Sequence, residues 1–252
     1  MEGLQELLWE CAPYLCGWQA CYHGCLHGQG LVFDTPRHMK TSDRAYWAAS
    51  ITSSVHALLI VKMSVGALVS TPELADTSNI NVTSPQSVLT GHVFWAYIIS
   101  DTCITLCYYG SWSGTKSMVI HHLFALAGWG LFIKAEFGHF LGLMGLIAEF
   151  TTPFVNLRWF LEKARMKSGT LYLVNGVLMA SLWFVIRVLG FVYLGYHIFV
   201  SRDAVARLPW LHSLTLMATY TVGFALQLYW FQKIARGAAK ALYGGAAKQG
   251  AL

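Results

Sequence analysis

The chain contains 252 residues, of which 56% are hydrophobic and only 12% are charged, and its formal net charge is +5. Its mean hydropathy of +0.49 is far above that of an ordinary soluble domain. This composition excludes a soluble globular enzyme and indicates an integral membrane protein, for which no nucleic-acid partner is expected.

The hydrophobic residues gather in blocks of about 20, the length that crosses a ~30 Å hydrocarbon core as an α-helix. No block alternates between apolar and polar residues with a period of two, as the strands of a membrane barrel would. The predicted fold class is therefore an all-α integral membrane protein, a six-helix transmembrane bundle plus an additional N-terminal helix. The six spans are predicted over 46–69, 88–109, 117–133, 140–157, 171–200 and 210–231.

The N-terminal stretch 1–33 is only marginally apolar, because it contains Glu6 and Glu10 as well as two histidines. It predicts a helix that either spans the membrane or lies in its interface. A cleaved signal peptide would need a basic start, but the first Lys or Arg is Arg37. The cysteines and histidines at 21–27 fit no standard zinc spacing, so no metal and no cofactor are expected.

Three regions are predicted along the chain: an N-terminal segment at 1–40, the six-helix domain at 41–236 and a cytosolic tail at 237–252. The tail is rich in Gly, Ala and Lys and has no apolar cluster that could form a core. It is expected to contribute at most an affinity for anionic headgroups.

The distribution of Lys and Arg predicts the orientation of the chain. With the region before Tyr46 in the cytosol, cytosolic segments hold twelve of the seventeen basic residues, the opposite side holds three, and two lie within spans. The positive-inside rule then places the C-terminus in the cytosol. The polar loop 70–87 contains Asn81 in an Asn-X-Thr acceptor for N-glycosylation, and the same topology places it in the lumen.

Ionisable residues inside the spans are the main functional candidates, because each costs at least a few kcal/mol at membrane depth. His56, Asp101, the pair His121 and His122, and Glu149 belong to four different spans. Counting along the helices places them roughly 6 to 15 Å below the cytosolic ends. This common depth predicts one shared cavity that opens toward the cytosol.

Other polar residues share helix faces with these groups. Tyr97 recurs four residues before Asp101, and Glu149, Thr152 and Asn156 lie on one stripe. Pro153 cannot donate to the carbonyl of residue 149, so a kink beside the carboxylate is expected. The candidate substrate-binding residues are His56, Tyr97, Glu149, Thr152, Asn156, Arg158 and Asn175.

Adjacent side chains on a helix diverge by ~100°, so at most one of His121 and His122 can face the cavity. A neutral imidazole could act there as base or nucleophile, with Asp101 fixing its tautomer. The catalytic candidates are therefore His121, His122 and Asp101; alternatively, both imidazoles only bind neighbouring carbonyls. Arg187, in a later span, requires a carboxylate from another helix and could serve as a lock for the bundle.

Four stretches resemble the TLC domain family, which is named for TRAM, LAG and CLN proteins and includes the ceramide synthases. They are 47–56, Ile-Ile-Ser-Asp at 98–101, 118–122 and Ala-Glu-Phe-Thr-Thr-Pro-Phe-Val-Asn-Leu-Arg-Trp-Phe at 148–160. The likeness extends over roughly 47–240. It implies a TLC-type bundle, a location in the endoplasmic reticulum or a related membrane, and a part in membrane lipid homeostasis.

Ceramide synthases join an acyl group from acyl-CoA to a sphingoid base, and their paired histidines match His121 and His122. The synthases carry two aspartates in a later helix, where this chain has Glu149, Asn156 and Arg158. The resemblance therefore favours a protein that binds membrane lipids or a fatty acyl chain, with acyl-CoA-dependent acyl transfer as the alternative. Proton-coupled transport has less support, because no internal repeat is visible. No oligomeric state follows from the sequence.

Overall fold

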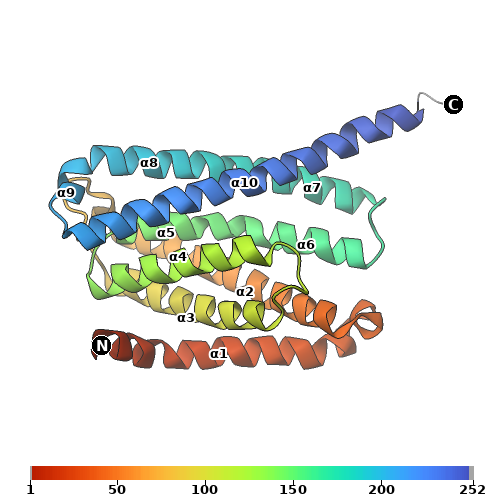
Figure 1. The fold of residues 1–252 in the computed structure, drawn as a ribbon, viewed down its shortest axis with the longest axis horizontal. Helices are drawn as coiled ribbons and strands as arrows, with labels where there is room; N and C mark the ends of the chain where they lie inside the picture. Colours follow the sequence, from red (N-terminus) through yellow and green to blue (C-terminus); the bar gives the residue numbers. More distant parts are fainter. Residues whose placement is uncertain (1, 250–252) are drawn as a thin grey trace.

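The computed structural model describes residues 2–249, and the side chains of residues 3–238 (Figure 1). Over that range the chain is a bundle of long helices and contains no β-strand. Among the described residues, four helical segments are long and apolar enough to cross a membrane, at Thr41–Ser70, Thr115–Lys134, His139–Lys163 and Thr170–Val200. The prediction of an all-α membrane protein is confirmed.

The elements follow in chain order, with short 3-10 helices at η1, η2 and η3 and a π-helix at η4. They are α1 (Glu2–Val32), η1 (Thr35–His38), α2 (Thr41–Ser70), η2 (Pro72–Ala75), α3 (Pro85–Cys107), α4 (Thr115–Lys134), α5 (His139–Ile147), η3 (Ala148–Thr151), α6 (Thr152–Lys163), α7 (Thr170–Leu182), η4 (Trp183–Leu189), α8 (Gly190–Val200), α9 (Arg202–Ala206) and α10 (Trp210–Gln249).

Six helical rods correspond to the six predicted spans, because α5, η3 and α6 form one rod and α7, η4 and α8 form another (Figure 1). The rods run up and down, with α3 and α10 beside α4. Loop 71–84, turn 135–138 and α9 lie at one end of the bundle, which we call the α9 end. Loops 108–114 and 164–169 lie at the other, which we call the α6–α7 end.

Local sequence signals explain where the rods start. Ser84 and Ser87 form a capping box at the start of α3, in which each hydroxyl accepts from the backbone N–H of the other residue, at 3.1 and 2.8 Å. Gly114 and Gly138 precede α4 and α5 with φ of +79° and +69°, a conformation that glycine adopts without a steric penalty.

The N-terminal helix α1 runs the whole length of the bundle against α2 and α3 (Figure 1). Trp18 is only 8% exposed and donates through Nε1 to the carbonyl of Val93 at 3.2 Å. Gln19 donates to Ser100 Oγ at 3.0 Å, and Glu6 pairs with Lys134 at 2.7 Å. Both acidic residues of this marginally apolar stretch therefore contact neighbouring helices, since Glu10 also lies 3.4 Å from His92 of α3.

The first part of the predicted tail at 237–252 continues the last helix, because α10 extends to Gln249 and projects past the end of the bundle (Figure 1). The residues from 250 onward lie outside the described part of the chain.

Two rods are interrupted where they meet in the middle of the bundle. Ala148–Thr151 is a 3-10 turn ahead of Pro153, so the α-helix is interrupted at the place where the kink was predicted. The carbonyl of Glu149 still accepts a hydrogen bond, from the backbone N–H of Thr152. Trp183–Leu189 is a π-helix, a conformation that is rare and often marks functional sites. The two interruptions contact each other.

The orientation of this bundle in the membrane is a prediction that a protease assay can test. We expect a tag after residue 252 to be digested in sealed microsomes, because most basic residues lie at the α6–α7 end. A matched tag within the exposed loop around Asn81 should be protected until detergent is added. If the C-terminal tag were protected and the loop tag digested, the orientation would be the reverse of the predicted one.

Candidate functional site

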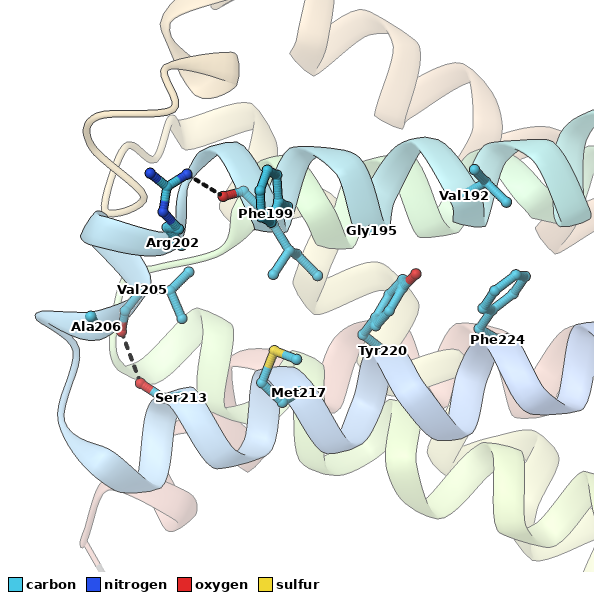
Figure 2. A pocket seen from close by; sticks show the side chains of 11 residues that line it. Val192, Gly195, Phe199, Arg202, Val205, Ala206, Ser213, Met217, Tyr220 and Phe224 are labelled. Atoms are coloured by element: carbon cyan, nitrogen blue, oxygen red, sulfur yellow. Dashed lines mark hydrogen bonds between the residues drawn. The ribbon is translucent and has the colours of Figure 1, made fainter.

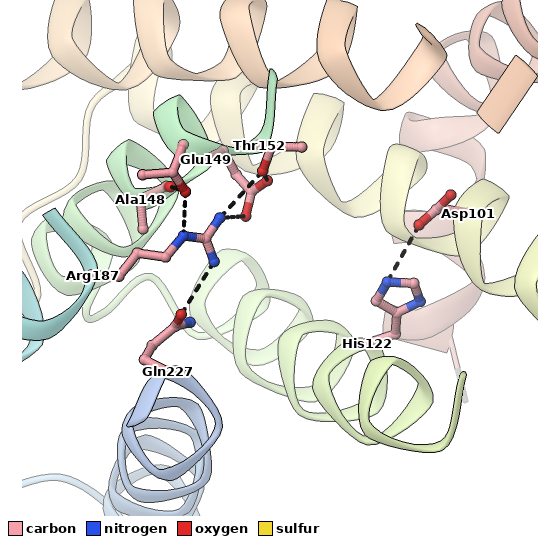
Figure 3. Close-up of polar contacts among 8 residues, drawn as sticks. Asp101, His122, Ala148, Glu149, Thr152, Arg187 and Gln227 are labelled. Carbon is pink, nitrogen blue, oxygen red and sulfur yellow. Dashed lines mark hydrogen bonds and ion pairs between the residues drawn. The ribbon is translucent and has the colours of Figure 1, made fainter. Parts of the chain in front are cut away.

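Two polar clusters lie inside the bundle on different sides of α4 (Figure 3). One joins Arg187 of η4 to Glu149 of η3, and the other joins Asp101 of α3 to His122 of α4. Both combine a basic with an acidic side chain, as buried charges in membrane helices normally do.

The Arg187 cluster uses every nitrogen of the guanidinium. Nη2 lies 3.3 Å from Oε1 of Glu149 and also donates to Thr152 Oγ1 at 3.2 Å, while Nε donates to Thr151 Oγ1 at 2.6 Å. Nη1 donates to Oε1 of Gln227 on α10 at 3.2 Å. Arg187 is 5% exposed, so this network, which joins three rods, satisfies a charge that would otherwise be costly.

The hydroxyl of Thr152 completes the cluster by donating to Oε2 of Glu149 at 2.7 Å. The guanidinium also lies over the indole of Trp183, 4.4 Å from the ring centroid. The opposite charges of Arg187 and Glu149 cancel, so the cluster as a whole is neutral.

The Asp101–His122 pair has a defined arrangement of protons. Thr102 Oγ1 lies 2.5 Å from the carbonyl of Ile98 and must donate its single proton there. It can therefore only accept from Nδ1 of His122, which lies 3.1 Å away. Nε2 of His122 faces Oδ2 of Asp101 at 3.3 Å.

Two lone pairs do not face each other at that distance, so a proton lies between Nε2 of His122 and Oδ2 of Asp101. Whichever atom carries it, the pair is neutral overall and His122 presents no free lone pair. His122 is also only 2% exposed. In this arrangement His122 connects α4 to Asp101 and Thr102 of α3.

His121 points to the other side of α4, because it is one residue, and therefore ~100°, away from His122. Its ring is 5.6 Å from that of Trp230 on α10, in an edge-on arrangement. No hydrogen bond to the His121 ring occurs among residues 3–238, whose side chains the structure describes. Both ring nitrogens are thus available to a bound molecule.

An inner cavity of ≈ 120 Å³ begins at His121 and the Arg187 cluster and lies between α4, α5, α8 and α10. That volume is several times the roughly 10–15 Å³ that one water needs. Its wall is polar at His121, Glu149, Arg187 and Gln227 and otherwise almost entirely apolar, with Phe132, Leu141 and Leu216 toward the α9 end. A polar end joined to an apolar channel suits an elongated amphipathic molecule.

The prediction of one cavity shared by all the ionisable groups is corrected by this geometry. Glu149 and His121 line the inner cavity, whereas Asp101 and His122 lie outside its lining. The cavity also extends from the polar cluster toward the α9 end, whereas the prediction had it open at the opposite end. The reason is the rotation of α4, which directs its two histidines to different neighbours.

His56 and Tyr97, predicted to bind substrate, stack face to face with ring centroids 3.6 Å apart. Trp18 of α1 packs edge-on against His56 at 5.4 Å, and His56 is 1% exposed. Neither nitrogen of His56 has a hydrogen-bond partner among the described residues. This pair belongs to the packed core rather than to the cavity wall.

Replacing His56 with Phe is expected to raise the free energy of unfolding of the delipidated protein by about 1–3 kcal/mol, because unpaired buried polar atoms are removed while the ring is retained. The measurement is denaturant or thermal unfolding in detergent. His139→Phe is the matched control, since both nitrogens of this buried histidine are bound, to Ser87 Oγ at 2.8 Å and the Phe132 carbonyl at 3.1 Å. Equal destabilisation by both changes would show that His56 has polar partners.

Three other residues predicted to bind substrate connect helices instead. Asn156 donates to the Ser50 carbonyl and to Ser54 Oγ, each at 2.9 Å. Asn175 donates to the Phe154 carbonyl at 2.9 Å. The guanidinium of Arg158 stacks on Tyr172 at 4.1 Å. The first joins α6 to α2, and the other two join α6 to α7, all away from the lining of the inner cavity.

Three hydrogen-bonding residues of the cluster, Arg187, Gln227 and Thr151, are absent from the candidates predicted to bind substrate. Arg187 was expected to have a carboxylate partner on another helix, and Glu149 is that partner. Gln227 was not selected, although a primary amide within an apolar span is also costly to bury without a partner. That cost is the signal by which the sequence could have identified it.

Membrane-length helices around an inner cavity with a buried ion pair at one end define a multi-pass helical membrane protein with an internal cavity. The chain belongs to the TLC domain family, whose sequence profile matches residues 46–236. The family predicted from the sequence is confirmed.

Several curated relatives share this domain. Human TLC domain-containing protein 4 is 30% identical over 155 residues, which cover 58% of this chain and 56% of the relative. TLC domain-containing protein 4-B of Xenopus laevis is 35% identical over 156 residues, or 58% and 57%. Human Protein CLN8 is 32% identical over 122 residues, which cover 46% of this chain and 41% of the relative. The match therefore spans little more than half the length of the first two relatives.

Proposed function

We propose that this protein binds a lipid acyl chain in the inner cavity and acts in lipid homeostasis of an intracellular membrane, the endoplasmic reticulum or a related one. The observation that carries the proposal is the combination of an apolar channel with a polar end formed by His121, Glu149, Arg187 and Gln227. Membership of the TLC domain family supports a lipid-related role.

The neutral state of the polar cluster narrows the chemistry of the ligand. Glu149 already balances the charge of Arg187, so a free carboxylate would bring an uncompensated charge into the bundle. A hydroxyl, amide or ester group can instead form hydrogen bonds with the free imidazole of His121. We infer that the ligand is a lipid with a neutral polar group close to its acyl chain.

Filling the cavity tests this proposal. Ala125 of α4 lines the inner cavity, and Ala127, two residues later, is exposed outside it. We expect the purified wild type and Ala127→Phe to retain a lipid through detergent extraction, and Ala125→Phe to lose it. Mass spectrometry of the extracted lipids gives the readout, and thermal unfolding checks that both variants fold. Equal lipid retention in both variants would refute binding in this cavity.

The alternative function is acyl transfer of the ceramide-synthase type, and the unpartnered ring of His121 is the observation that favours it. In that reaction acyl-CoA is the co-substrate and the amine of a sphingoid base attacks the thioester carbonyl. His121 would remove the proton from the amine while the thiolate of CoA leaves. The Asp101–His122 pair would support α4 beside it without touching the reacting atoms.

A further inference from the structure

A second hollow lies on the outside of the bundle, in the groove between α8 and α10 (Figure 2). It has a volume of ≈ 630 Å³, and apolar side chains form most of its lining. Val192 and Phe199 on its wall are 52% and 65% exposed, so the groove faces the surrounding lipid. Among the lining residues are Val192, Phe199, Val205, Met217, Tyr220 and Phe224.

The groove exists because the two helices diverge toward the α9 end. α10 packs closely on α4, α7 and η4 and then separates from α8, as Figure 2 shows. The side chains of Met217, Tyr220 and Phe224 extend from α10 into the space between the helices.

The outer groove and the inner cavity adjoin each other, because they share two lining residues. Ile198 and Tyr220 line both. The hydroxyl of Tyr220 donates to the carbonyl of Phe191 at 3.2 Å, across the gap between the helices. It fits there because residue 195 is glycine, since a Cβ on Gly195 would lie 2.2 Å from that hydroxyl oxygen. Tyr220 therefore lies between the two spaces, held by this hydrogen bond and by stacking on the rings of Phe191 and Phe224, at 6.4 and 6.1 Å between centroids.

The outer groove is about as long as one leaflet of the bilayer is thick, and like a leaflet it is apolar along its length and charged at one end. From Val192 to Arg202 it covers ten residues, or ~15 Å, about half of a ~30 Å hydrocarbon core. Arg202 lies at its α9 end, with the guanidinium 5.2 Å from the Phe199 ring and a side chain that is 62% exposed. Asp203 is 3.9 Å away and 83% exposed, so this solvated contact leaves the cation available.

We propose that the outer groove binds one acyl chain of a membrane phospholipid, with the phosphate on Arg202, and that it is the lateral entrance through which the chain reaches the inner cavity. A long apolar surface that ends in a cation at headgroup depth matches the chain and phosphate that all phospholipids share. Rotation of Tyr220 away from the Phe191 carbonyl would join the two spaces. This inference rests on the proposed binding of an acyl chain in the inner cavity.

A photoreactive phospholipid tests the entrance. The protein is placed in phosphatidylcholine nanodiscs that contain a phosphatidylcholine with a diazirine on one acyl chain, and labelled peptides are mapped by mass spectrometry over time. We expect label on α8 and α10 in the groove, and later on Phe124 of α4, which lines the inner cavity. Tyr220→Phe, which keeps the ring but loses the hydrogen bond, should label Phe124 several-fold faster.

Blocking the groove supplies the decisive comparison. Met217→Trp fills the groove from α10, whereas Leu214→Trp places the same bulk on an exposed position of α10 outside the lining. We expect Met217→Trp to reduce labelling of both spaces several-fold and Leu214→Trp to reduce neither. Arg202→Gln should reduce groove labelling, although Arg202 also donates to the Phe199 carbonyl at 3.4 Å. Arg207→Gln is the matched control, because Arg207 lies outside the groove lining and donates to the Ser78 carbonyl at 3.0 Å.

The outcomes separate this inference from the proposed function. If Phe124 is labelled equally fast in the wild type and Met217→Trp, the inner cavity binds a chain but the groove is not its entrance. Label confined to the groove in the wild type would overturn the entrance together with the proposed function. Groove labelling that is unchanged in Arg202→Gln would overturn the assignment of the phosphate.

Discussion

Replacing Arg187 with Met is expected to lower the free energy of unfolding by ~3–5 kcal/mol, the usual cost of removing one partner of a buried ion pair. Glu149 would remain inside the bundle without its cation, and the hydroxyl of Thr151 and the amide of Gln227 would lose the donor that they bind. Thermal or denaturant unfolding of the purified protein in mild detergent gives the measurement.

Arg158→Met is the matched control, because this arginine stacks on Tyr172 without a carboxylate partner among the described residues. Its loss should cost only about 0.5–1 kcal/mol. The double change Glu149→Gln with Arg187→Met should cost less than the sum of the single changes, with a coupling of about 0.5–3 kcal/mol. If Arg187→Met proves as stable as Arg158→Met, the ion pair does not hold the two interrupted rods together.

Alanine substitutions at the two histidines are expected to affect different properties: the stability at His122 and the binding of lipid at His121. His122→Ala should lower the free energy of unfolding by about 1–3 kcal/mol, because it leaves Asp101 and Thr102 without a partner. His121→Ala should leave the stability nearly unchanged, since its ring forms no hydrogen bond within the described chain. His121→Ala should instead lose the cavity lipid during purification. In His122→Ala the amount of bound lipid should fall only in proportion to the amount of folded protein.

The same variants decide between lipid binding and acyl transfer. Given acyl-CoA and a sphingoid base, the purified wild type is expected to make little or no ceramide, because the chain lacks the paired aspartates of the synthases. Robust transfer that falls by ~10²–10⁴ in His121→Ala, at unchanged stability, would replace the binding proposal with the enzymatic one. Transfer that falls only in proportion to stability would exclude His121 as the base.

The sequence predicts the rods and identifies the ionisable residues within them, because both depend on a local property. Apolar blocks of membrane length predict helices, and a charge within such a block is costly wherever it lies. Asp101, Glu149 and the two histidines could therefore be selected from the sequence. Pro153 predicts the interruption beside Glu149 for an equally local reason, the missing N–H.

The pairing of these groups depends on how each rod is rotated, which no local pattern specifies. A different rotation of α4 would exchange the neighbours of His121 and His122. The candidates at Asn156 and Asn175 show a second limit, since buried amides also connect helices inside membranes. A polar residue in a span therefore indicates that a partner exists, but not whether the partner is a ligand or another helix.

The π-helix at Trp183–Leu189 makes the structure sensitive to insertions and deletions at this point of the chain. The wide turn of a π-helix contains about one residue more than an α-helical turn. Each added residue rotates the helix that follows it by ~100° about its axis. The position of Gly195 opposite Tyr220 is therefore set by this extra residue. A deletion of one residue within the wide turn would keep the rod helical and its composition nearly the same, yet it would turn a different face of α8 toward α10. Changes in length at this point are thus expected to be far more damaging than conservative substitutions.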